Sequence, residues 1–107
     1  MLKSFNKQTS MILLSEKRIE NSIQRYLDSL GAYHIKNHGS VYSRAGTPDI
    51  TACINGLFVA IEVKQPGGVV SPLQAAHIEL IKKAGGTAFV AYSLDDVKHE
   101  LRKAGLI

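Results

Sequence analysis

The stretch that decides the fold spans residues 46–64 and reads Gly-Thr-Pro-Asp-Ile-Thr-Ala-Cys-Ile-Asn-Gly-Leu-Phe-Val-Ala-Ile-Glu-Val-Lys. Asn55 and Gly56 stand between two apolar runs. This pair favours the tight type I′ turn of a β-hairpin, which needs a positive φ at both central residues. With that turn, the register of the two strands follows by counting, and Asp49 lies directly opposite Glu62.

Successive side chains of a strand point to opposite faces, so the predicted hairpin has two different surfaces. The wholly apolar face consists of Ile50, Ala52, Ile54, Leu57, Val59, Ile61 and Val63. The other face consists of Asp49, Thr51, Cys53, Phe58, Ala60, Glu62 and Lys64. Two carboxylates and a lysine therefore share one patch, and Cys53 is expected to pack as a small hydrophobe.

The facing carboxylates of Asp49 and Glu62 indicate a cation site. Directly opposed side chains of an antiparallel pair have Cβ atoms about 4.5–5.5 Å apart, and like charges there destabilise the sheet. Two carboxylates from neighbouring strands suit a hard divalent ion such as Mg²⁺. Lys64 lies about 6.6 Å along the strand from Glu62 and reaches an anion held by that ion. The alternative interpretation is a solvated polar face with a chance pairing.

The spacing of these residues resembles that of the PD-(D/E)XK nuclease superfamily, with Pro48-Asp49 as the first half of its motif and Glu62-Val63-Lys64 as the second. A narrower resemblance is to the VRR-NUC branch, the virus-type replication and repair nuclease domain. It rests on Gly46-Thr47-Pro48-Asp49, the Gly67-Gly68 turn and Ser71-Pro72-Leu73-Gln74, and it covers the chain from Glu16 onward. The resemblance implies an α/β fold with a mixed central sheet flanked by helices.

The same resemblance implies metal-dependent cleavage of phosphodiester bonds. Asp49 and Glu62 would hold Mg²⁺ or Mn²⁺ together with the main-chain carbonyl of Val63. The ion would lower the pKa of a bound water and polarise the scissile phosphate. Lys64 would steady the attacking hydroxide or the charge that develops on the phosphoryl oxygens.

Two further candidate site residues each have a competing structural explanation. Superfamily members often add a glutamate from the first helix, and Glu20 fits this role by its spacing. Glu16 is the rival, although a glutamate near a helix N-terminus also complements the helix dipole. Gln74 is a site residue by resemblance to the VRR-NUC branch, yet Ser71 and Gln74 also form a capping box that needs no function.

Length and composition are compatible with one compact domain. The 107 residues with 45% hydrophobic content suffice for a single core, which we assign to residues 15–107, with residues 1–14 as a mobile arm. The single cysteine excludes an intrachain disulfide and a cysteine-rich zinc site, and it fits a cytoplasmic protein of phage or bacterial type. The N-terminal apolar run is too short for a signal peptide or a membrane span.

Positive charge is unevenly placed along the chain. Residues 1–44 carry seven Lys or Arg and three acidic residues, whereas the remainder carries six of each. An uneven basic surface suits a phosphate backbone, although modest positive charge also occurs in proteins that never touch nucleic acid. The candidate DNA contacts are Arg25, Lys36 and Arg44, because they lie on or beside predicted ordered elements.

The remaining elements follow from periodicity and from start and stop residues. We expect a helix capped by Ser15 and ending near Leu30, a strand within residues 32–42, a strand over residues 87–92 and a last helix over residues 94–103. A further helix over residues 72–84 should turn inward Leu73, Ala76, Leu80, Ile81 and Ala84. The hairpin strand that carries Glu62 should run parallel to residues 87–92, because a helix connects them.

The sequence therefore predicts a metal-dependent DNA endonuclease of the DNA repair type. A domain this small has no separate module that reads base edges, so specificity should come from DNA shape. Resemblance to Holliday-junction resolvases suggests branched DNA and a homodimer, because symmetric cleavage of a four-way junction needs two active sites. The alternatives are a flap or single-strand nuclease acting as a monomer, and a non-catalytic DNA-binding subunit that keeps the nuclease fold.

Overall fold

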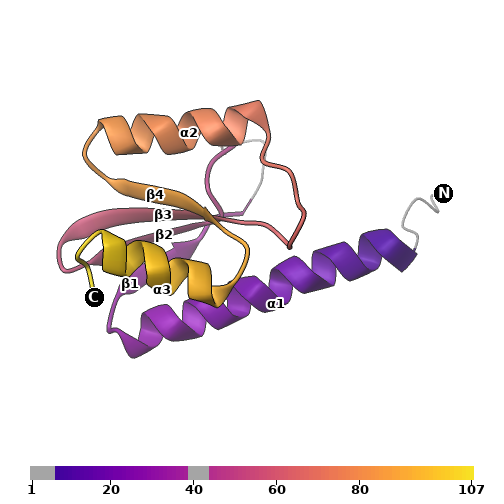
Figure 1. The fold of residues 1–107 in the computed structure, drawn as a ribbon, viewed down its shortest axis with the longest axis horizontal. Helices are drawn as coiled ribbons and strands as arrows, with labels where there is room; N and C mark the ends of the chain where they lie inside the picture. The colour runs from indigo at the N-terminus through magenta and orange to yellow at the C-terminus, as the bar shows by residue number, and fades with distance from the viewer. Residues whose placement is uncertain (1–6, 39–43) are drawn as a thin grey trace.

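A computed structural model of the chain describes residues 7–38 and 44–107. Its elements follow one another as α1 (Lys7–Ser29), β1 (Tyr33–Lys36), β2 (Ile50–Ile54), β3 (Leu57–Val63), α2 (Pro72–Lys83), β4 (Thr87–Ala91) and α3 (Leu94–Lys103). The four strands form one sheet in the order β1-β2-β3-β4. Figure 1 shows α2 on one side of the sheet and α1 and α3 on the other.

The mixed sheet confirms the predicted fold class. β1 and β3 both pair antiparallel with β2, and β3 pairs parallel with β4 through the connection that contains α2. The hairpin forms as its turn residues predict, with a φ of 51° at Asn55 and 80° at Gly56. Its register runs from Ile54 opposite Leu57 to Ile50 opposite Ile61, which confirms the predicted pairing along the whole of β2.

The main core lies between the apolar face of the hairpin and the helices α1 and α3. Ile50 and Ile61 are fully buried there, together with Leu27 of α1 and Leu101 of α3. Leu57 was expected in this core but is half exposed, because it borders the turn. The burial of this face fixes the register, since a slip by one residue would turn the whole apolar set toward solvent.

A smaller core lies under α2 and consists of Ala60, Ile78 and Ala88. The predicted inward positions of α2 are wrong for Leu73, Ala76, Leu80 and Ala84, which are exposed, and right for Ile81, which packs against this core. Ile78 is the buried residue of this helix. The face of α2 that points inward also includes the polar residues Gln74 and His77, whose side chains have partners outside the helix. A prediction based on apolar residues alone therefore selected a face that is turned away from the true one.

Two other expectations differ from the structure. The first helix begins at Lys7, so the predicted start at Ser15 is wrong, and Figure 1 shows its N-terminal end extending past the sheet. Residues 7–14 contain no Gly or Pro, so nothing in them interrupts a helix. Residues 1–6 of the predicted arm lie outside the described residues, and the division into arm and domain stays a prediction. Cys53 is exposed rather than packed.

The strand predicted within residues 32–42 is shorter than expected. Its described part is β1 (Tyr33–Lys36), and residues 39–43 lie outside the described residues. None of the described helices is long and apolar enough to cross a membrane.

Candidate active site

The two carboxylates of the hairpin meet where β2 begins and β3 ends. Continuing the register by one position places Asp49 opposite Glu62. The backbone N–H of Val63 donates to Oδ2 of Asp49 over 2.8 Å, which fixes the aspartate side chain against β3. Glu62 is almost completely buried, with 3% of its surface exposed. The juxtaposition predicted from the hairpin therefore forms in the structure.

The electrostatics of Glu62 show that the nearby positive charge does not offset its burial and the charge of Asp49. Burial, and after it the negative charge of Asp49, raises the pKa of Glu62 from 4.5 to about 8. Its Oε1 atom is buried and has no hydrogen-bond partner among the described residues. Buried charges in proteins are normally paired or bind a metal. A cation between the two carboxylates would satisfy this oxygen.

Lys64 lies on the same patch, as predicted. Its Nζ is 3.8 Å from Oε2 of Glu62, and its side chain is largely buried. The backbone N–H of Lys64 donates to the carbonyl of Ala91 over 3.0 Å, so the end of β3 remains anchored to β4. The ammonium group opposes the raised pKa of Glu62 but does not cancel it.

Gln74 joins the site through the start of α2. Its Oε1 accepts from the backbone N–H of Ser71 over 2.9 Å, and its own backbone N–H donates to Oγ of Ser71 over 3.1 Å, which together make the capping box. The amide nitrogen of Gln74 donates to Oε2 of Glu62 over 3.1 Å. The capping box therefore forms, and because it fixes the oxygen it also aims the NH₂ group at Glu62. A role of Gln74 in the reaction stays a prediction.

The two glutamates of α1 both face the site, one helical turn apart. Glu20 is buried with 9% of its surface exposed, and its Oε2 is 3.3 Å from Nζ of Lys36. Burial raises its pKa, Lys36 opposes the rise and Asp49 adds to it. Glu16 accepts from the backbone N–H of Gln65 over 3.4 Å and contributes to the raised pKa of Glu62. The structure thus brings Glu20 close to Asp49 without excluding Glu16.

The three candidate DNA contacts lie in different surroundings. Arg25 is exposed on α1, and Arg44 is exposed before β2. Lys36 is partly buried at the end of β1, where its ammonium is paired with Glu20. Their contacts to DNA stay predictions, and Lys36 has in addition a partner inside the site.

Sequence reasoning missed two residues that hold the Asp49 loop. Asn37 donates from its side chain to the carbonyl of Pro48 over 2.8 Å and from its backbone to the carbonyl of Asp49 over 2.7 Å. His77 Nε2 lies 2.9 Å from the carbonyl of Ala45 and donates to it. Asn37 could be found only from the register of β1, whereas His77 follows Gln74 by three residues and so shares its helix face.

The residues present fit a hard divalent ion but not a closed cage of side chains. Among residues 7–38 and 44–107, no group of three or more His, Cys, Asp or Glu side chains is placed to hold a metal. Mg²⁺ commonly takes one or two carboxylates and keeps several waters. Asp49 and Glu62 meet that requirement, and the unsatisfied Oε1 of Glu62 is the atom such an ion would bind. A zinc site with four protein ligands has no support here.

The fold and this cluster define the class of protein. A mixed sheet with Asp49 directly before one hairpin strand and Glu62 and Lys64 at the end of the next is the arrangement expected from the PD-(D/E)XK resemblance. The sequence model of the VRR-NUC domain matches residues 2–95. The chain belongs to the VRR-NUC domain family, and it is therefore a nuclease domain, a hydrolase that acts on DNA.

Solved structures agree with this assignment. A structure described as a VRR_NUC domain is similar with a TM-score of 0.70 and 26% identity, over 83% of this chain and 95% of the other. A second, described as a VRR_NUC domain protein, shares the fold with a TM-score of 0.62 and 20% identity, over 81% and 84%. None of the curated proteins compared matches the sequence.

A third similar structure is Hjc of Archaeoglobus fulgidus, described as a Holliday junction resolvase from an archaeal hyperthermophile. Its TM-score is 0.54 with 26% identity, over 70% of this chain and 65% of that chain. The likeness to this resolvase agrees with the nuclease fold.

Proposed function

We propose that this protein is a Mg²⁺- or Mn²⁺-dependent DNA endonuclease that selects branched DNA. The observation that carries the proposal is the pairing of Asp49 with the buried Glu62, which has one oxygen without a partner among the described residues and a pKa raised to about 8. An arrangement this unfavourable without a cation is typical of a functional site. Asp49, Glu62 and the main-chain carbonyl of Val63 would hold the ion. Glu20, whose Oε2 is paired with Lys36 in this structure, would become a further ligand only by leaving that ion pair.

The ion would supply a bound water of lowered pKa and a polarised phosphate. The chain's own residues prepare the site for that chemistry. Gln74 holds Oε2 of Glu62 by a hydrogen bond of 3.1 Å and so leaves Oε1 as the free ligand atom. The backbone N–H of Val63 orients Asp49 in the same way. Both carboxylates are thereby fixed before an ion arrives.

Lys64 acts on the substrate rather than on the ion. Its ammonium stands 3.8 Å from Glu62, a distance long enough for a weak ion pair that can be given up to a phosphate oxygen. A fixed positive charge beside the reacting phosphate stabilises the charge that develops in the transition state. Lys36 performs a second electrostatic task, since its pairing with Glu20 offsets part of the negative charge of the cluster.

Branched DNA is the substrate that the similarity to Hjc favours, because that protein is described as a Holliday junction resolvase. Cleavage of a four-way junction at symmetric positions needs two active sites, and a C2 homodimer supplies them. Such an enzyme would act on DNA in the cytoplasm as part of DNA repair. Shape, more than base sequence, would determine where it cuts.

One assay tests the proposal. Labelled four-way junction, flap, duplex and single-stranded DNA are incubated with Mg²⁺, Mn²⁺ or EDTA, and a Glu62→Ala variant serves as the control. We expect symmetric cleavage of the junction with either ion and none with EDTA or with the variant. If a monomer cuts the flap, flap DNA replaces the four-way junction as the assigned substrate. If the protein binds DNA but does not cut it with any metal, it is a non-catalytic subunit.

A further inference from the structure

The two carboxylates of the candidate active site are held by the backbone in different ways. Glu62 lies within β3, where it is the partner of Val90 of β4. Asp49 comes before β2, which begins at Ile50, and the chain bends at Asp49. The pairing of strands therefore fixes the backbone of Glu62, whereas the backbone of Asp49 depends on further contacts.

Asn37 makes these further contacts from the position directly after β1. Its side-chain amide donates to the carbonyl of Pro48 over 2.8 Å, and its backbone N–H donates to the carbonyl of Asp49 over 2.7 Å. The first carbonyl belongs to the peptide unit before the Cα of Asp49, and the second belongs to the unit after it. Because each peptide unit is planar, the orientations of the two units set φ and ψ of Asp49. Asn37 therefore holds both soft dihedral angles of this residue.

The position of the Asp49 carboxylate depends on this backbone geometry. Its Oδ2 accepts from the backbone N–H of Val63 over 2.8 Å. The aspartate side chain is short, so a rotation of its backbone moves the carboxylate as well. Pro48 is buried, so water does not easily replace a donor that its carbonyl loses. The side-chain bond of Asn37 therefore stabilises the geometry that keeps the carboxylate on β3.

We propose that Asn37 is a positioning residue for the metal site, and that its side-chain bond to Pro48 keeps the Asp49 carboxylate on β3 beside Glu62. The inference rests on the proposed function, because it assigns a role toward the ion that these two carboxylates would hold. Residues that orient a metal ligand without touching the ion typically change metal affinity by about 10–100-fold when they are substituted. An effect of this size is expected for the side chain of Asn37.

The loop before Asp49 is attached to α2 at two other points. His77 donates from Nε2 to the carbonyl of Ala45 over 2.9 Å. A Cβ added at Gly46 would lie 2.8 Å from Cγ of Leu73, so the glycine allows the loop to pack directly on this helix. Both attachments are independent of the contacts that come from β1. The loop should therefore keep its path when the side-chain bond from β1 is removed, and only its last residues should shift.

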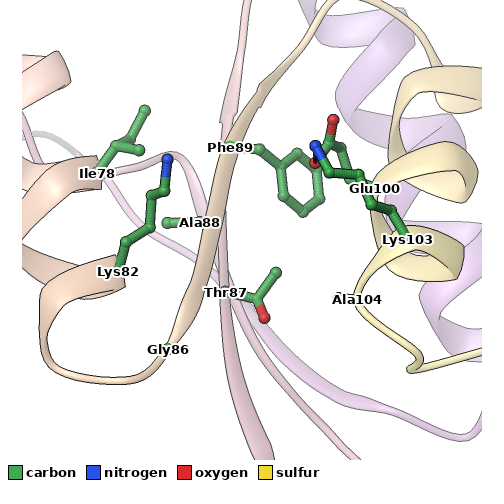
Figure 2. A pocket seen from close by; sticks show the side chains of 9 residues that line it. All are labelled: Ile78, Lys82, Gly86, Thr87, Ala88, Phe89, Glu100, Lys103 and Ala104. Carbon is green, nitrogen blue, oxygen red and sulfur yellow. Dashed lines mark ion pairs between the residues drawn. The ribbon is translucent and has the colours of Figure 1, made fainter.

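A pocket at the other end of β4 supplies a control position. Figure 2 shows it along β4, with α2 on one side of the strand and α3 on the other, and its volume is about 480 Å³. Thr87 lines this pocket and is the partner of Val59 of β3, four residues before Val63 and so about 13 Å away. Thr87 and Asn37 are both half-buried. Thr87→Val therefore removes a polar group of similar exposure outside the site.

Hydrogen exchange of backbone amides, measured by NMR on the full chain without metal or DNA, tests the position of Asp49. Asn37→Leu removes the donor and keeps the size of the side chain. The N–H of Val63 should then exchange at least about tenfold faster than in wild type, because it loses its partner on Asp49. Asn37→Ala removes the same donor without adding an apolar group, and it should give the same result if the leucine variant does not fold.

Two controls separate the proposed role from a general loss of stability. The N–H of Lys64 donates to the carbonyl of Ala91 over 3.0 Å, and its exchange should change by less than about twofold in Asn37→Leu. Both amides should keep their wild-type exchange in Thr87→Val. Equal acceleration of the Val63 and Lys64 amides in Asn37→Leu, or unchanged exchange of Val63, would overturn the inference.

Calorimetry with Mn²⁺ tests what this position does for the ion. Asn37→Leu should weaken the Mn²⁺ affinity by about tenfold or more, and Thr87→Val should bind as wild type does. An unchanged affinity in Asn37→Leu would overturn the inference even if wild type binds the ion and cuts DNA. If wild type binds no Mn²⁺ although Val63 responds as expected, the proposed function is rejected and the role of Asn37 toward Asp49 is kept.

Discussion

At the scale of single residues, the proposed metal site depends on Glu62. A carboxylate that is 3% exposed beside a second carboxylate is unfavourable when ionised, and Lys64 at 3.8 Å does not neutralise the cluster. The pKa of Glu62 is about 8 because burial, and after it the negative charge of Asp49, disfavours the ionised carboxylate. The hairpin places this carboxyl group where a bound cation would stabilise its ionised form, and the proposed chemistry needs that cation.

The raised pKa predicts how stability changes with pH. The folded protein binds a proton on Glu62 up to about pH 8, whereas the unfolded chain releases it near 4.5. The metal-free protein should therefore lose stability as pH rises between these two values. We expect the Tm in EDTA to fall by about 5 °C or more between about pH 5 and pH 8.5.

Two controls accompany this measurement. Glu62→Gln should remove most of the fall in Tm, because the amide cannot lose a proton. Saturating Mn²⁺ should also reduce it, because the ion binds the ionised carboxylate. An equal fall of Tm in wild type and Glu62→Gln would show that Glu62 does not titrate as described.

Lys64 is predicted to serve the reaction without holding the ion. Lys64→Ala should keep the Mn²⁺ affinity measured by calorimetry and lower the cleavage rate by about 10²–10³-fold, as removal of one electrostatic stabiliser does. Lys83→Ala, which removes an exposed lysine of α2, is the matched control and should cut normally. Lost Mn²⁺ binding with unchanged turnover would mean that the assigned role is wrong.

At the scale of elements, the start of α2 unites folding and function. The capping box fixes the Gln74 amide, and the amide holds Glu62. Substitutions can separate the capping of α2 from the contact with Glu62. The side chain of Ser71 takes part only in the cap, whereas Gln74 takes part in both.

Ser71→Ala should cost about 1 kcal/mol of unfolding free energy, as the loss of an N-cap does, and should reduce cleavage only slightly. Gln74→Ala should lower cleavage by at least about tenfold, because Glu62 loses the donor that orients it. Urea unfolding and the junction assay measure the two effects. Equal losses of activity in both variants would leave Gln74 with a capping role alone.

An element can be predicted from the sequence when neighbouring residues determine it, and not when contacts with distant residues do. The hairpin was predictable to the residue, because Asn55-Gly56 sets the turn and the alternation sets the faces. The inward face of α2 was not, because Gln74 and His77 point inward for polar contacts that hydrophobicity cannot reveal. The start of α1 was missed because residues 7–14 show no apolar periodicity although they form a helix.

The site was predictable where it follows from pairing within one hairpin. Asp49, Glu62 and Lys64 meet as counted from the turn. The pairing of Lys36 with Glu20 and the clamp of Asn37 on the Asp49 loop depend on how β1 and α1 dock against the sheet. No local pattern encodes such long-range packing.

At the scale of the whole molecule, exposed basic residues are the candidates for holding DNA. Arg25 and Arg44 are exposed, whereas Lys36 is paired inside the site. If the two arginines contact phosphates, Arg25→Gln and Arg44→Gln should each reduce the salt slope of duplex binding by about 0.9. Fluorescence anisotropy measures the slope in a Glu62→Ala background, which we expect not to cut DNA. Unchanged slopes in both variants would move the DNA-binding face elsewhere.

The measurement that tests the central claim most directly is the calorimetric titration of Mn²⁺ into wild type and into Glu62→Gln. This variant keeps the size of the side chain and removes the charge. Wild type should bind Mn²⁺, and the variant should bind at least about 100-fold more weakly, because a charged ligand is lost from a site with few protein ligands. Equal Mn²⁺ affinities of the two proteins, or no binding by wild type, would contradict the assignment of Asp49 and Glu62 as the metal centre.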